Sequence, residues 1–70
     1  MFNEEKNIKK KITEAICELE YSNNVLLKML FEEIEYCGYS IMSLSYQNQI
    51  QSNRKIIKKL KKILGENNEQ

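Results

Sequence analysis

The 70-residue chain contains no histidine, aspartate, proline or tryptophan, and it has only two cysteines and two glycines. Without histidine and aspartate, it lacks the usual metal ligands and the usual general base. The cysteines, glutamates and tyrosines that remain form no recognisable set of acid, base and nucleophile. The sequence therefore predicts no catalytic residues, no metal site and no cofactor, and we expect a protein that is not an enzyme.

Cys17 and Cys37 are too far apart in the sequence to form a CxxC motif. They are predicted to be two reduced, half-buried thiols, and a disulfide that joins two helices is the alternative. The longest apolar run is too short to span a membrane, and the first residues lack the apolar core of a signal peptide. We therefore expect a cytoplasmic protein without a transmembrane segment.

The chain carries eleven basic and ten acidic side chains, which give a net charge of +1. This balance excludes both a basic coat for nucleic acid and an acidic mimic of it. At this length a single core barely outweighs chain entropy, so the fold needs support from a partner helix, a ligand or self-association. Abundant Lys, Asn, Ile and Glu are typical of AT-rich coding, as in low-GC bacteria, their phages and some parasites.

The clearest order lies in residues 40–64, where side chains recur at alternating steps of four and three, the spacing of a helix-packing seam. Heptad position a is taken by Tyr46, Asn53 and Leu60. Position d is taken by Met42, Gln49, Ile56 and Ile63. Position e adds apolar residues that widen the seam, namely Ile50, Ile57 and Leu64. Ser40 is the expected N-cap of this helix, and Gly65 is the expected C-cap.

Two further helices are predicted, at about 3–20 and 23–37, from their apolar spacing. The boundary between them rests on Ser22, Asn23 and Asn24, which are poor helix formers and favour a turn. If that turn is absent, the two helices fuse into one long rod. Residues 66–70 are expected to form a frayed polar tail.

These patterns predict an all-α protein with a single domain over residues 1–65. Its architecture is a small three-helix bundle with helices at about 3–20, 23–37 and 40–64, or a helical hairpin that self-associates with coiled-coil-like packing. In the bundle, the acids near 32–35 lie beside the lysines at 9–11, so that the helix ends are complementary in charge. We expect a homo-oligomer.

Gln49 and Asn53 interrupt the apolar seam one turn apart. A buried amide in such a seam fixes register and oligomeric state, because only the matched arrangement satisfies its hydrogen bonds. The alternative is that this part of the helix simply faces water. The surrounding segment, GYSIMSLSYQNQIQSNRKIIKKLKKIL, resembles the core-forming helices of SNARE proteins, which keep a glutamine layer inside an apolar seam. The resemblance implies a coiled-coil helix that joins partner helices.

Basic side chains follow one another along the last turns of the same helix, and they form a ridge that phosphate groups would bind. The ridge comprises Arg54, Lys55, Lys58, Lys59 and Lys62. Nucleic-acid or ribosome binding is therefore one alternative function. A solvated helix face is favoured over it, because no aromatic side chain is interleaved for base stacking and the helix dipole accounts for the charges.

The favoured function is that of a small non-enzymatic binding or regulatory protein that acts through helix-mediated contacts, for example an inhibitor of a larger target of the phage or parasite type. The side chains expected at the partner interface are apolar or aromatic and cluster around the second helix and the following corner. They are Leu27, Phe31, Tyr36, Tyr39 and Tyr46.

Overall fold

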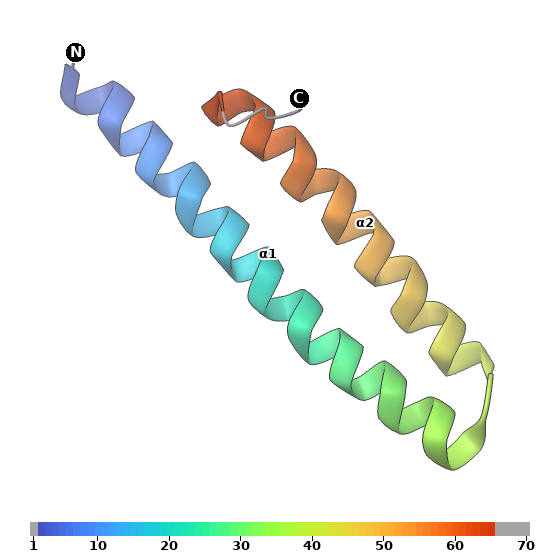
Figure 1. Cartoon of the computed structure of the whole chain (residues 1–70). Helices are drawn as coiled ribbons and strands as arrows, with labels where there is room; N and C mark the ends of the chain where they lie inside the picture. Colours follow the sequence, from blue (N-terminus) through green and yellow to red (C-terminus); the bar gives the residue numbers. More distant parts are fainter. Residues whose placement is uncertain (1, 66–70) are drawn as a thin grey trace.

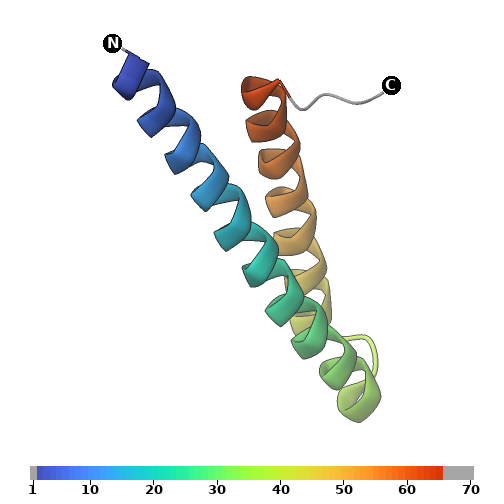
Figure 2. The same cartoon turned by 60° about the vertical axis from the view of Figure 1, so that its left-hand side comes forward.

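The computed structural model describes residues 2–65, with side chains from Glu4 onward. Helix α1 covers Phe2–Cys37 and helix α2 covers Ile41–Leu64. Figures 1 and 2 show the two helices side by side, with residues 38–40 joining them at one end and the first turn of α1 and the last turn of α2 at the other. The molecule is a helical hairpin with extents of 53 × 24 × 14 Å, so it is a single layer of helices. The predicted tail at 66–70 lies outside the described residues.

The expected turn at Ser22, Asn23 and Asn24 is wrong, because α1 continues through all three residues. The predicted break between 3–20 and 23–37 does not form, and the chain takes the alternative of one long rod. Ser22 and Asn24 point to solvent, whereas Asn23 is buried against α2. Their low helix propensity amounts to only a few tenths of a kcal/mol each, and packing against α2 outweighs it.

The corner between the helices is held by the side chains of its own residues. Gly38 has a φ of 75°, and its N–H donates to the carbonyl oxygen of Ile34 at 2.9 Å. The predicted N-cap is confirmed: Ser40 accepts a hydrogen bond from the Ser43 N–H, and Ser43 Oγ accepts one from the Ser40 N–H. The Ser40 hydroxyl also donates to Glu33 Oε2 at 2.9 Å, which ties the start of α2 to α1.

The far end of α2 follows the sequence expectation as well. Gly65 has a φ of 83°, and its N–H bonds to the carbonyl oxygens of Lys61 and Lys62. Glycine suits both Gly38 and Gly65 because a side chain strains a backbone with positive φ.

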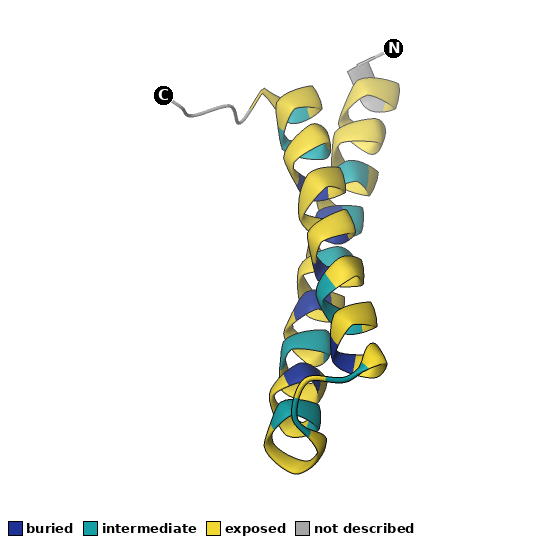
Figure 3. Cartoon of the chain, turned by 90° about the vertical axis from the view of Figure 1, so that its right-hand side faces the viewer, coloured by how far each residue is buried: buried dark blue, intermediate teal, exposed yellow. Residues whose placement is uncertain are grey.

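The helices meet along a seam that is narrower than predicted (Figure 3). Its buried apolar side chains are Ile16, Leu30, Ile50 and Ile57. On α2 all the positions predicted as a and e are buried or half-buried, namely Tyr46, Ile50, Asn53, Ile57, Leu60 and Leu64, and Ser43, Gln47 and Lys61 join them. The predicted d positions, Met42, Gln49, Ile56 and Ile63, are exposed and form what we call the α2 ridge. A single partner helix covers only one stripe of α2, which leaves Ile63, for example, 67 % exposed.

The charge pairing expected between residues 32–35 and 9–11 is also wrong within one chain. Both groups lie on the continuous helix α1, so they are about 35 Å apart at 1.5 Å per residue. Among the described residues, the one ion pair joins Lys61 Nζ and Glu20 Oε2 at 3.6 Å, across the open half of the hairpin.

Replacing Ser40 by alanine removes the capping box and the link to Glu33. We expect Ser40→Ala to lower the free energy of unfolding by about 1 kcal/mol in urea denaturation followed by circular dichroism. Ser45→Ala is the matched control, because Ser45 is exposed on the same helix, and its effect should stay within about 0.5 kcal/mol. Equal stabilities of the two variants would show that the corner is not held by its cap.

Candidate protein-binding surfaces

Three amide side chains form a hydrogen-bonded layer across the middle of the hairpin. Asn53 Nδ2 donates to Asn23 Oδ1 at 2.8 Å, and Gln49 Nε2 donates to Asn53 Oδ1 at 3.0 Å. Asn23 Nδ2 makes a longer bond of 3.4 Å to the carbonyl oxygen of Ile50. Asn53 is 4 % exposed, so within the seam these groups bond to one another in place of water.

The residues that form this layer differ from the expected pair, Gln49 and Asn53. Asn53 is buried, whereas Gln49 lies on the exposed α2 ridge and reaches Asn53 from the side. Asn23 is the partner that sequence reasoning missed, because it was assigned to a turn. Its distance of four residues from Leu19 and seven from Leu30 was the available signal. The role of the layer in setting register stays a prediction.

The loop end of the hairpin exposes large apolar and aromatic side chains. We call this surface the tip, and it comprises Phe31, Tyr36, Tyr39, Ile41 and Leu44. Tyr36 is 81 % exposed and Ile41 is 87 % exposed. Sequence reasoning missed Ile41 and Leu44, because they lie outside the heptad seam. Their position directly after the Ser40 cap was the signal that they flank the corner.

The five residues predicted for the partner interface do not form one patch. Tyr36 and Tyr46 line one hollow, on the side of the hairpin that carries Met29. Tyr39 lines a second hollow, at the corner. Leu27 lines a third on the opposite side, near Arg54. Phe31, Tyr36 and Tyr39 are the exposed members that lie at the loop end, and Tyr36 shares its hollow with the half-buried Tyr46.

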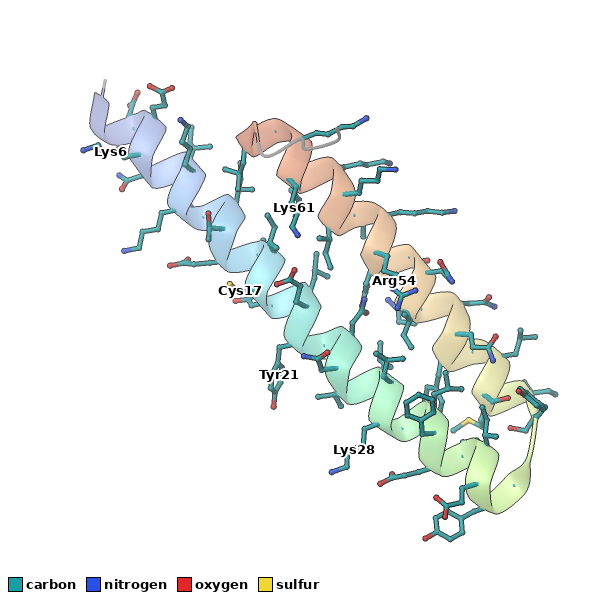
Figure 4. The ribbon with its side chains drawn as sticks, in the orientation of Figure 1. Lys6, Cys17, Tyr21, Lys28, Arg54 and Lys61 are labelled. Carbon is teal, nitrogen blue, oxygen red and sulfur yellow. The ribbon has the colours of Figure 1, made fainter. Side chains whose placement is uncertain are left out.

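The basic ridge is exposed as predicted at Arg54, Lys55, Lys58, Lys59 and Lys62. Lys61 differs from these residues, because it is half-buried and turns toward α1, where it meets Glu20 (Figure 4). No acidic residue lies within α2 to neutralise the basic ridge. It therefore presents several positive charges along one helix face, without aromatic side chains between them.

No known protein family, curated protein or solved structure matches this chain. Function therefore has to be inferred from the surfaces themselves.

Within residues 2–65, neither helix is apolar over a length that could cross a membrane, and no group of three Cys or Glu side chains could hold a metal ion. Cys17 and Cys37 are free thiols, and both are exposed where half-buried ones were expected.

The amide layer can be tested by unbalancing it. In Asn53→Leu, the buried Asn23 amide loses its partner, and we expect the free energy of unfolding to fall by about 1–3 kcal/mol. Replacing both Asn23 and Asn53 by leucine should recover most of this loss, because neither buried amide is then left without its partner. Urea denaturation of the two single variants and the double variant measures both effects. A single variant as stable as the unmodified chain would contradict the prediction.

Proposed function

We propose that the protein is a non-enzymatic binding protein that contacts another protein through the tip of its hairpin. The observation that carries this proposal is the exposure of six large apolar or aromatic side chains within residues 31–44, namely the five of the tip and Met42 of the α2 ridge. Scattered apolar residues are normal on a protein surface, whereas a contiguous group is typical of an interaction site. Tyrosine is especially common at the centres of interfaces, where its ring is buried and its hydroxyl bonds to the partner.

The corner that carries the tip supports this proposal because it is held in one conformation. The capping box and the hydrogen bond from Ser40 to Glu33 fix the backbone between the helices. A surface that is ordered before binding loses less conformational entropy when it docks. A protein of this size acts by occupying part of its target's surface, which is how a small inhibitor or regulator works.

Self-association belongs to the same proposal. The α2 ridge exposes Met42, Ile56 and Ile63 at intervals of seven or fourteen residues, a spacing that suits packing against a further helix. One layer of two helices leaves this ridge uncovered, and a second hairpin stacked on it forms a four-helix bundle. The tip and the α2 ridge are different surfaces, so one can be altered without the other.

Two exposed tyrosines provide a matched test of the tip. Tyr39 lies in the tip and is 82 % exposed, whereas Tyr21 is 72 % exposed but points away from α2 in the middle of α1 (Figure 4). A photo-crosslinking residue placed at Tyr39 should capture a discrete partner in the cell, and the same residue at Tyr21 should not. With that partner purified, we expect Tyr39→Ser to weaken binding at least tenfold and Tyr21→Ser to leave it unchanged. Equal effects of the two variants would contradict binding by the tip.

Nucleic-acid or ribosome binding is the second candidate, and the exposed basic ridge on a helix that itself contains no acidic residue favours it. We expect the full chain to bind duplex DNA or RNA no more tightly than a non-specific binder, with a Kd of about 10⁻⁴ M or weaker at physiological salt. Tighter binding that falls steeply with salt, and that is lost in Lys58→Glu/Lys62→Glu, would favour this candidate over the tip.

A SNARE-like role requires α2 to leave α1 and to join helices of other proteins. The hairpin supports a different behaviour, because α1 already covers the seam of α2. We expect the isolated chain to be helical and to melt cooperatively, as followed by circular dichroism. A chain that is largely disordered until partner helices are added would instead support the SNARE-like role.

A further inference from the structure

The two long sides of the hairpin differ in chemistry. On one side, Glu20, Arg54 and Lys61 lie across the seam, and Glu20 pairs with Lys61. The other side carries the α2 ridge and a stripe of α1 whose members are three, four or seven residues apart. This α1 stripe comprises Lys11, Ala15, Ser22, Met29, Glu33 and Tyr36. The second side is poorer in charge, and we call it the apolar side.

We propose that the apolar side is covered by a second copy of this chain, stacked with the two hairpins antiparallel and their loops at opposite ends. The inference rests on the self-association proposed above and specifies its geometry. Each α1 then packs against α1 of the second copy, and each α2 against α2. A two-fold axis crosses the interface at right angles to the helices, and this symmetry constrains which residues meet.

The stripe of α1 matches an antiparallel copy of itself in charge and in side-chain size when the two copies cross at Ser22. When α1 is paired with an antiparallel copy at that point, Lys11 meets Glu33 of the second copy. Ala15, which is small, meets Met29, which is large. Ser22 meets its own copy, and its small side chain allows the helices to approach closely. Opposite charges and unequal sizes are therefore matched by the same choice of axis.

The α2 ridge leads independently to the same axis. An antiparallel pairing of this ridge with its copy brings Met42 to Ile63 and Gln49 to Ile56, with the centre between residues 52 and 53. In the hairpin, Asn53 is hydrogen-bonded to Asn23, so this centre lies at the level of residues 23–24 of α1. The two helices thus place the axis at nearly the same level, within about 2 Å at a rise of about 1.5 Å per residue.

The distribution of charge distinguishes this arrangement from the parallel one. Residues 4–20 and 54–62, in the open half of the hairpin, carry ten basic and five acidic side chains, whereas residues 32–35, near the loop, carry three acidic side chains and no basic one. Antiparallel stacking sets the acidic loop end against the basic open end of the second copy. Parallel stacking sets like charges together at both ends, which is unfavourable.

The first measurement is molar mass by light scattering over a concentration series of the full chain. We expect a dimer. Ile56→Glu, on the α2 ridge, should shift it to monomer while helicity is retained, because Ile56 is already partly exposed. Leu44→Glu, on the tip, is the matched control and should leave the mass unchanged. A monomer at every concentration would overturn both self-association and the antiparallel geometry, while binding through the tip would stand.

The orientation is measured by pulsed electron paramagnetic resonance with one spin label per chain. In Cys17→Ser, the label sits on Cys37 at the loop end, and the antiparallel dimer separates the two labels by about 45 Å. In Cys37→Ser, the label sits on Cys17, near the level of the axis, and gives a short distance in either arrangement. A distance below about 25 Å between Cys37 labels would overturn the antiparallel geometry and leave self-association intact.

Discussion

We propose that the alignment of the hairpin depends on the hydrogen bond between the buried amides of Asn23 and Asn53. The apolar seam around it is small, and side chains such as Ile16, Leu30 and Ile57 would pack almost as well after a shift of one heptad. The amides would not, because a shift by seven residues places Asn23 beside Tyr46 or Leu60 and leaves a buried polar group unpaired. On this proposal, apolar burial stabilises the pairing of the helices, and the amides select one alignment of it.

The sequence predicted the parts of the fold that depend on local chemistry. Ser40 and Gly65 mark the ends of α2 because capping involves only a few neighbouring residues. The break at residues 22–24 was wrong for a related reason: the local propensity of Asn23 favours a turn, whereas a contact with Asn53, thirty residues away, favours a helix. No local rule includes that contact, and without it the choice between three helices and a hairpin cannot be made.

The candidate sites show the same division. The heptad spacing of α2 correctly identified an apolar stripe, but it could not show how much of the stripe a single neighbour would cover. The position of that neighbour decides that Ile57 is buried and Ile56 exposed. Tyr36 and Tyr39, near Gly38, are exposed, and their role at a partner interface stays a prediction. Tyr46 is half-buried on the side of the hairpin that carries Met29, which spacing alone does not specify.

The short connection at residues 38–40 has a consequence for the order in which the hairpin forms and opens. Contacts beside the connection, such as that between Ser40 and Glu33, close small loops, whereas contacts toward the termini close progressively larger ones. Once the corner exists, each further turn of α2 finds α1 already nearby, so the two helices can zip together from that end. Opening follows the reverse order and begins at the termini. Thermal fraying therefore erodes the basic end first, and the apolar side chains around the corner keep their arrangement until the last turns separate.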